Sequence, residues 1–236
     1  MAKVNISKNY LKDNGILLND YNNKEIHSTE SELIVIDKIL YKLIHGEYIH
    51  KKQAIIEFFH DLDCDLPITL IDLLYDNNKL YGYSMNLLDD YVTLYEVLNS
   101  DISLLERKKI ALEMIKIYEK LLDLKVVYFD WHSKNLMFRN DLKLLDIDSA
   151  INTKSVHYDI IARRSLFSLC LEVLIGVDID FDYTSLEIDE MLEKISNSED
   201  ISLSKIIPLS IDYMKKEIDS YTVDKVDYVK ELIIKM

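Results

Sequence analysis

The first part of the chain carries short runs of apolar and β-branched residues, a pattern typical of strands. The runs form two pairs, at 32–37 with 39–44 and at 67–75 with 79–88. Turn-favouring residues separate the members of each pair, Asp37-Lys38 in the first and Asp76 to Asn78 in the second. We therefore predict two β-hairpins. Between them, apolar residues at helical spacing predict a helix over 50–62, namely Ala54, Ile55, Phe58 and Phe59.

The second part of the chain has the longer period of amphipathic helices. Residues 103–124 predict one long helix, with Ser103 as N-cap and Glu106 three positions later in a capping-box pattern. Residues 162–176 are apolar on nearly every side, which predicts a buried central helix that ends at Gly176. Further amphipathic helices are expected from Ser185 onward. The fold class is therefore α+β, with a strand-rich lobe over 1–88 and a helical lobe over 89–236.

Composition indicates a globular protein. The 236 residues are 49% hydrophobic and 30% charged, and the formal net charge is −14. A negative chain repels phosphates, so we expect no non-specific binding to nucleic acid or to an anionic membrane. No run of about 18 apolar residues suggests a membrane span, and the first residues lack the apolar core of a signal peptide. Cys64 and Cys170 lie in different regions and are interpreted as reduced thiols, which favours a cytoplasmic location.

Two clusters of polar residues stand out against their apolar surroundings. The stretch "VYFDWHSKNLMF" holds Asp130 and Asn135, and "LKLLDIDSA" holds Asp146, eleven residues after Asn135. An Asp on a short loop can orient a hydroxyl group and accept its proton, while an Asn and a second Asp can bind a hard cation through oxygen. These are the groups that phosphoryl transfer requires. A helix before them and a short hairpin between them are expected to bring the three side chains together.

In order and spacing, the segment "YFDWHSKNLMF…LKLLDID" resembles the catalytic loop and metal-binding motif of the protein-kinase-like superfamily. Asp130 falls on the catalytic Asp of that family, Asn135 on the metal-binding Asn, and Asp146 on the Asp of D-F-G. His132 is similar to the D-x-H-x-x-N variant of aminoglycoside and other small-molecule phosphotransferases. The resemblance implies a bilobal fold with an antiparallel-sheet N-lobe carrying one helix, a mainly helical C-lobe, and the use of ATP and Mg²⁺.

The resemblance also implies a strand lysine that contacts the phosphates and a helix glutamate that holds it. Lys42 and Lys38 compete for the first role. Lys42 is preferred because it lies mid-strand, where a lysine is costly unless it is paired, whereas Lys38 lies where the chain should turn. Glu57 is the only acid inside the helix between His50 and His60, and it is the expected partner.

Other parts of the nucleotide site follow from position alone. The phosphate-covering loop is expected at Ser28, Thr29 and Ser31, although the glycines of the family are absent there and the backbone is less free to approach phosphates. Met85 falls at the residue that borders the adenine site, so backbone groups of Asn86 and Leu88 are expected to bind adenine.

The acceptor is left open by the sequence. We expect transfer of the γ-phosphate to a protein Ser or Thr hydroxyl. A small-molecule acceptor is the first alternative, because about a dozen residues separate Asp148 from the central helix and no A-P-E motif is visible. The second alternative is a pseudokinase that binds nucleotide or a partner protein without turnover, which the missing glycines favour.

Overall fold

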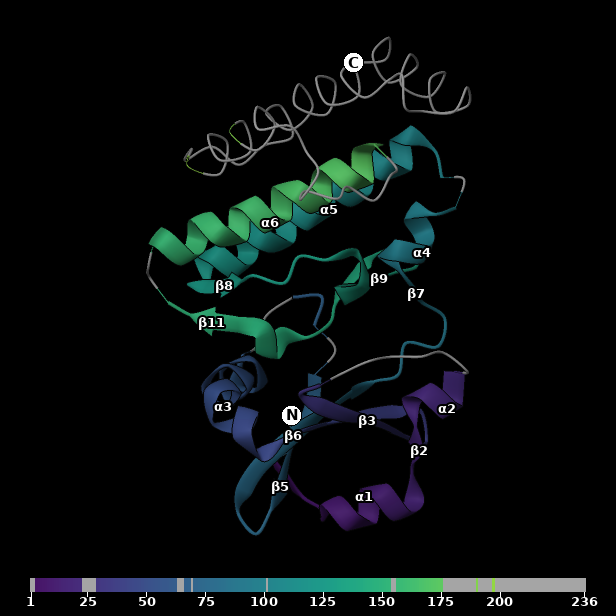
Figure 1. The fold of residues 1–236 in the computed structure, drawn as a ribbon, viewed down its shortest axis with the longest axis vertical. Coiled ribbons are helices and arrows are strands. Elements are labelled where there is room, and N and C mark those ends of the chain that lie inside the picture. Colours follow the sequence, from purple (N-terminus) through teal and green to yellow (C-terminus); the bar gives the residue numbers. More distant parts are fainter. Residues whose placement is uncertain are drawn as a thin grey trace. The chain divides into compact units, whose positions relative to one another are not determined.

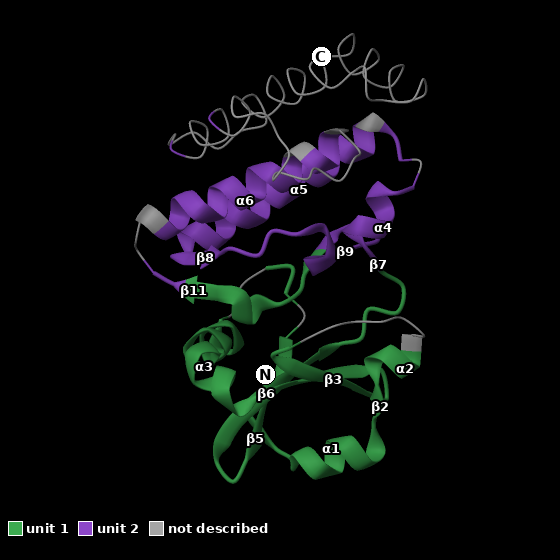
Figure 2. Ribbon diagram, viewed as in Figure 1, with its two compact units in different colours: residues 1–91, 143–151 green, residues 92–142, 152–236 purple. Residues whose placement is uncertain are grey.

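The structure, a computed structural model, describes residues 3–22, 29–62, 66–68, 70–100, 102–153, 156–175, 190 and 197. Strands and helices are mixed along this part of the chain, so the α+β class is confirmed (Figure 1). Two compact units are formed: unit 1 contains residues 1–91 and 143–151, and unit 2 contains residues 92–142 and 152–236 (Figure 2). The sequence-based division at residue 88 assigned 143–151 to the helical lobe, whereas this segment belongs to unit 1.

Unit 1 is built on a six-stranded sheet of order β1-β5-β6-β4-β3-β2. Its strands are β1 (Lys3–Asn5), β2 (Ile16–Leu17), β3 (Ser31–Ile36), β4 (Ile39–Ile44), β5 (Leu70–Asp76) and β6 (Lys79–Asn86). All neighbouring pairs are antiparallel except β1 with β5, which is parallel. The sheet is therefore mixed, where an antiparallel sheet was expected.

Both predicted hairpins are present. In the β3–β4 turn, Asp37 and Lys38 have φ of 49° and 64°, and in the β5–β6 turn Asn77 and Asn78 have φ of 49° and 62°. Positive φ at both central residues defines the two-residue turn whose twist matches that of the flanking strands. Asp and Asn tolerate this conformation better than other residues with a side chain, which explains why these positions end the strands.

Helices pack around this sheet at α1 (Lys8–Asn14), α2 (Leu18–Asn22) and α3 (Gly46–Asp61). Leu11 of α1 is fully buried in an apolar cluster with Ile34, Leu43, Leu74 and Tyr81. Helix α3 contacts β5 and β6. The predicted helix at 50–62 is thus confirmed but starts earlier, at Gly46. The elements before Ser31 were not predicted, and one helix was expected where the described part of unit 1 has three.

Gly82 of β6 permits a close approach of β6 to β4. A Cβ atom at this position would lie 2.1 Å from the backbone oxygen of Lys42. Because the obstacle is backbone in a paired strand, Gly82→Ala is expected to cost about 1–3 kcal/mol of unfolding free energy. Gly46→Ala is the control, because no atom of the described residues lies within 4 Å of its added methyl group. Denaturant unfolding measures both variants, and equal stabilities would contradict the prediction.

Unit 2 consists mainly of helices. Its elements are β7 (Val92–Thr93), α4 (Leu94–Leu98), α5 (Leu104–Asp123), β8 (Val126–Tyr128), the 3₁₀ turn η1 (Ser133–Asn135), β9 (Leu136–Phe138) and α6 (Val156–Ile175). The chain passes into and out of unit 1 through β10 (Leu142–Leu144), the 3₁₀ turn η2 (Ile147–Ser149) and β11 (Ala150–Asn152).

Two long helices, α5 and α6, pack against each other in unit 2. The predicted cap of α5 is confirmed, since the hydroxyl of Ser103 accepts a hydrogen bond from the Glu106 N–H at 3.2 Å. Helix α6 begins at Val156, six residues before the predicted start. Cys170 of α6 is a buried free thiol. Cys64, Gly176 and nearly all of the tail predicted to be helical from Ser185 lie outside the described residues.

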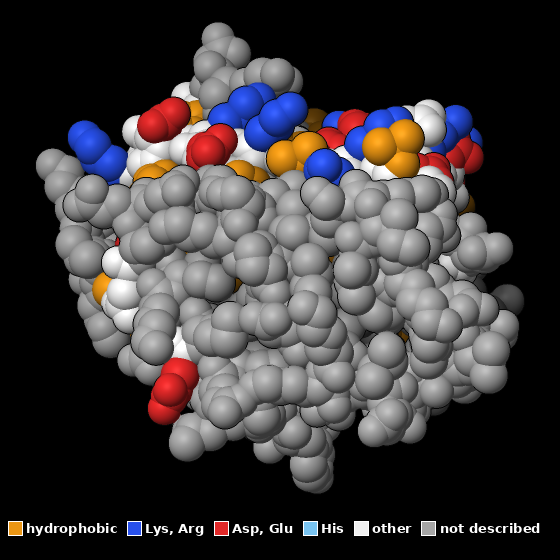
Figure 3. Space-filling model, turned by 90° about the horizontal axis from the view of Figure 1, so that it is seen from above, with side chains coloured by type: hydrophobic (Ala, Val, Ile, Leu, Met, Phe, Trp, Pro, Cys, Tyr) orange, Lys and Arg blue, Asp and Glu red, His pale blue; other side chains and the backbone are white. Residues whose placement is uncertain are grey.

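Side chains of both charges intermix with hydrophobic ones where described residues are visible in Figure 3. Within the described ranges, no helix combines the length and the apolar character needed to cross a membrane.

Candidate functional site

Lys42, near the middle of β4, is the centre of a buried ionic cluster in unit 1. Only 5% of the residue is exposed. Its ammonium group donates hydrogen bonds to Asp146 Oδ1 and Asp148 Oδ1, each at 2.8 Å. Burial lowers the pKa of Lys42, but the two carboxylates outweigh burial and the pKa is raised. Lys42 is thus a fixed positive charge, because its partners compensate the cost of placing a cation inside the sheet.

Asp148 is the acid on which the cluster converges. Its Oδ1 accepts hydrogen bonds from Lys42 and, at 2.7 Å, from the hydroxyl of Tyr83, while Oδ2 accepts one from Lys52 at 2.7 Å. The side chain has no exposed surface. Burial raises the pKa of Asp148, but the ammonium groups of Lys42 and Lys52 outweigh it and lower the pKa to about 2. Asp148 therefore remains ionised at neutral pH, with both oxygens engaged.

The segment 143–151 holds the two aspartates against the sheet of unit 1. The N–H of Leu144 donates to the carbonyl of Pro67 at 2.8 Å, and Leu144 pairs with Ile68 in a parallel bridge. Asp146 then adopts the left-handed conformation, with φ 50° and ψ 41°. Asp tolerates this conformation better than most residues with a side chain, as Asp37 does in the β3–β4 turn.

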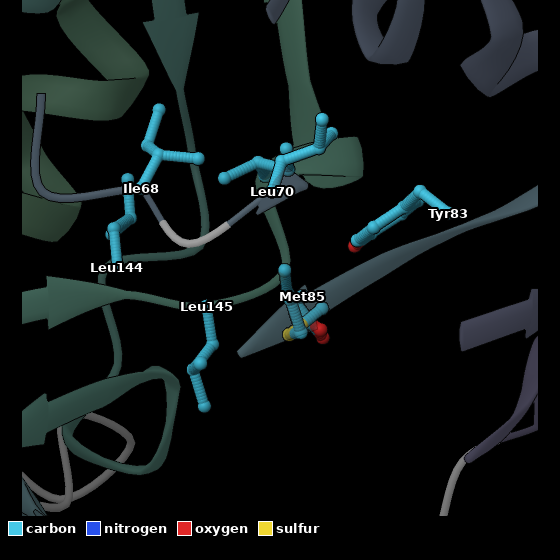
Figure 4. Close-up of a pocket in the computed structure, with 8 residues that line it drawn as sticks. Ile68, Leu70, Tyr83, Met85, Leu144 and Leu145 are labelled. Carbon is cyan, nitrogen blue, oxygen red and sulfur yellow. The ribbon is translucent and has the colours of Figure 1, made fainter. Parts of the chain in front are cut away.

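An apolar hollow adjoins the ionic cluster within unit 1 (Figure 4). It encloses about 160 Å³, including the part that is open to solvent. Its lining is Ile68, Leu70, Tyr83, Met85, Leu144, Leu145, Asp146 and Ile147. Two of these residues also bond to the cluster, Tyr83 to Asp148 and Asp146 to Lys42. Concave apolar sites with a few polar groups are typical of small-molecule binding.

The second polar cluster lies in unit 2, on the loop that follows β8. Asp130 is exposed, and its carboxylate makes no hydrogen bond among the described residues. The Asn135 side chain donates through Nδ2 to the backbone carbonyl of Asp130 at 3.2 Å, which closes the loop. His132 is exposed and accepts a hydrogen bond from the Lys134 N–H. The loop thus presents Asp130 to solvent in a defined conformation.

Trp131 anchors this loop to the core of unit 2. It is 4% exposed, and its ring lies against the rings of Tyr128 and Tyr118, with centroids 5.4 and 6.4 Å away. Its carbonyl accepts a hydrogen bond from Ser165 of α6. The hydroxyl of Tyr118 bonds in turn to Asp159, which also pairs with Arg163. In this loop Trp131 is therefore the residue that packs in the core, whereas the neighbouring Asp130 is exposed.

The expected Lys42–Glu57 pair is wrong in this structure. Among the described residues, Lys42 pairs with Asp146 and Asp148, whereas Glu57 accepts hydrogen bonds from Gln53 and from Tyr75 of β5. Lys38 occupies the β3–β4 turn, as the preference for Lys42 assumed. Glu57 and Lys42 thus belong to the same unit but not to the same cluster.

The remaining nucleotide-site predictions have mixed outcomes. Ser28 lies outside the described residues, and Thr29 is exposed. Ser31 is not a loop residue, because it starts β3 opposite Ile44 and is 5% exposed. Asn86 is the last residue of β6, and the carbonyl of Leu88 accepts a hydrogen bond from the Tyr91 N–H. Asn135 and Asp146 belong to different units, and each is described within its own.

Three members of the cluster were missed by sequence reasoning. They are Lys52, Glu30 and Tyr83. Lys52 of α3 bonds to Asp148 and pairs with Glu30 at 2.5 Å, and the Tyr83 hydroxyl donates to Asp148. A signal for Lys52 exists in the sequence, because it falls at helical spacing between the buried residues Ile49 and Ile56. A lysine on the buried side of a helix needs an acidic partner. No comparable signal marks Tyr83, one of several tyrosines in the strands.

Comparison with known proteins finds no family model that matches the chain and no match among curated proteins.

Proposed function

We propose that this protein is an ATP- and Mg²⁺-dependent phosphotransferase with a bilobal protein-kinase-like fold, unit 1 being its nucleotide-binding lobe. The observation that carries the proposal is the ion pair of the buried Lys42 with the partly exposed Asp146, 2.8 Å apart and beside an apolar hollow. A lysine and a metal-binding carboxylate beside an apolar site are what a nucleoside triphosphate requires. The resemblance of the Asp130, Asn135 and Asp146 segments supports the same function.

Each residue has a defined task in this proposal. Lys42 binds the α- and β-phosphates and withdraws charge from them. Backbone groups of Asn86 and Leu88, next to Met85 of the hollow, bind the adenine. Asp130 orients the acceptor hydroxyl and accepts its proton, for which its exposed carboxylate, without a hydrogen bond in the described part of the chain, is suited. Asn135 holds the Asp130 loop in shape through its side-chain hydrogen bond.

The chemistry of the donors fits a magnesium ion. The Asp146 side chain is 44% exposed, and among the described residues only its Oδ1 is engaged, by Lys42. Asn135 offers an amide oxygen, since its Nδ2 makes the hydrogen bond within the loop. Oxygen donors of this kind are those that Mg²⁺ selects. When bound, the ion neutralises the phosphate charges.

The acceptor is proposed to be a hydroxyl group of a protein Ser or Thr. One observation favours a small-molecule acceptor as second candidate: only residues 149–155 separate Asp148 from Val156, the first residue of α6. In protein kinases a longer segment at this place is ordered to support activity. A chain this short at that point leaves little backbone to hold a peptide.

Nucleotide binding tests the first part of the proposal. ATP with Mg²⁺ at about 100-fold excess over its Kd is expected to raise the Tm by about 5 to 11 °C, because a ligand that binds only the folded state stabilises it. Lys42→Met is expected to remove this shift. Lys38→Met, four positions away in the turn of the same hairpin, is expected to retain it. No shift in the wild-type protein would overturn the proposal.

Transfer is tested with ATP labelled in the γ-phosphate. Incubation with a mixture of unfolded proteins, and separately with a set of small alcohols and aminoglycosides, distinguishes the two acceptor classes. Label in protein Ser or Thr supports the first, and label in a small molecule supports the second. Binding of ATP without transfer to either would identify a pseudokinase and refute the proposed activity.

A further inference from the structure

In the ion pair between α3 and the segment 143–151, the helix supplies the cation and the segment supplies the carboxylate. The proposed function does not require this arrangement. In protein kinases the phosphate-binding lysine is held by a glutamate of the neighbouring helix. Here the helix contributes a cation, Lys52, and the acid comes from the other side, as Asp148. Asp148 lies between the two lysines and bonds to both.

The contacts of Asp148 engage both of its carboxylate oxygens. Lys42 and Tyr83 occupy Oδ1, Lys52 occupies Oδ2, and the side chain is fully buried. Asp148 is therefore not suited to bind a metal ion, although it lies two residues after Asp146. Asp146 differs, because it shares only one oxygen with Lys42 and reaches solvent.

Glu57, the helix acid expected to hold Lys42, is engaged elsewhere. It bonds to Gln53 on its own helix and to the Tyr75 hydroxyl at 3.3 Å. The contact that links α3 to the lysine cluster is therefore made by Lys52, whose Nζ also pairs with Glu30 just before β3. Asp148 and Lys52 together connect β4, α3 and the segment 143–151.

We propose that Asp148 is the positioning residue for Lys42, and that Lys52 of α3 fixes Asp148 in turn. Asp148 thus takes the place of the helix glutamate that holds the lysine in protein kinases. This inference rests on the proposed function. Its physical basis is that Lys42 has two carboxylate partners, the partly exposed Asp146 and the fully buried Asp148. When Asp146 turns to a metal ion, Asp148 still holds Lys42, because its own orientation is set by Lys52 and Tyr83.

The test compares the affinities of ATP with Mg²⁺ and of adenosine, which lacks phosphates, in full-length variants. Asp148→Asn keeps the shape of the side chain and removes its charge. It is expected to weaken ATP binding roughly 10- to 100-fold, the usual effect of removing a residue that supports a binding group. Adenosine affinity is expected to be unchanged, since adenosine does not contact Lys42. A purely structural role of Asp148 would weaken both ligands.

Two further variants keep the test decisive if Asp148→Asn does not fold. Lys52→Met leaves both carboxylates in place and is expected to weaken ATP selectively. Lys51→Met, at an exposed neighbouring position of α3, is the matched control and is expected to bind as the wild type does. Glu57→Gln separates the two possible positioning residues, and we expect no change in its ATP affinity.

The outcomes are distinguishable. Selective loss of ATP affinity in Asp148→Asn or Lys52→Met, with Glu57→Gln unaffected, supports the inference. Unchanged ATP affinity in both of the first two variants, equal weakening of ATP and adenosine, or selective loss in Glu57→Gln overturns it while leaving the proposed function intact. A wild-type protein that binds neither ligand overturns the proposed function itself.

Discussion

Asp130→Asn is expected to reduce phosphoryl transfer about 10²- to 10⁴-fold and to leave the stability of the protein unchanged. The loss in rate is that of removing a general base that accepts the acceptor's proton. Stability is retained because the Asp130 carboxylate is exposed and makes no hydrogen bond among the described residues. Substitution at an exposed position away from caps and ion pairs typically changes unfolding free energy by less than about 0.5 kcal/mol.

The measurement for Asp130→Asn pairs initial rates of transfer with denaturant unfolding. Asp123→Asn is the control, because Asp123 is an exposed acid of the same unit at the end of α5. It is expected to match the wild type in both measurements. Near-normal transfer by Asp130→Asn would remove Asp130 from the mechanism, and a large loss of stability would show that the side chain has a structural role.

Trp131→Ala, at the adjacent position, is expected to have the opposite effect. Removing a ring that is 4% exposed and packed on Tyr118 and Tyr128 leaves a cavity, at a cost of about 3–5 kcal/mol. For a chain of this size the Tm is expected to fall by about 6 to 20 °C. Circular dichroism is the suitable probe, since Trp131 is the only Trp and its loss removes the fluorescence signal.

Trp131→Phe is the matched variant. It retains an aromatic ring and removes the indole N–H, which is buried without a hydrogen-bond partner among the described residues. Loss of an unsatisfied buried donor offsets part of the lost packing, so a cost of about 1 kcal/mol is expected. Equal destabilisation by Phe and Ala would contradict this account of how Trp131 anchors the loop.

Local chemistry made the hairpins of unit 1 predictable. Asp37-Lys38 and Asn77-Asn78 interrupt apolar runs of suitable length, and their positive φ angles are ones that Asp and Asn adopt at low cost. The cap of α5 was predictable for the same reason, because a serine followed by a glutamate at the right spacing is a signal within a few residues. Helix α1 carries a similar signal, because Ser7 caps its start by accepting a hydrogen bond from the Tyr10 N–H and Gly15 follows its last residue, whereas strand β1 carries none. Strand β1 exists through its parallel pairing with β5, a partner about 70 residues away in the chain.

The chemistry of the site divides in a similar way. That a lysine in the middle of a strand must be paired was predictable from Lys42 alone, because an isolated cation inside a sheet is unstable. The acid that pairs with Lys42 was not predictable, because the side chains that α3 directs toward the cluster depend on the rotation of the helix about its own axis. Helix α3 presents Lys52 to the cluster and directs Glu57 to Tyr75. A change of one position along the helix rotates a side chain by about 100°, and spacing alone does not fix that angle.

The discontinuity of unit 1 affects how this protein emerges from the ribosome. The sheet is fully synthesised at Asn86, the last residue of β6, whereas Asp146 follows 60 residues later. At about 5–20 residues per second, translation of that interval takes about 3–12 s. Throughout it, Lys42 and Lys52 have no access to the carboxylates of Asp146 and Asp148. The N-terminal unit of the nascent chain therefore cannot reach its final stability before residues 92–142 of the second unit have been made.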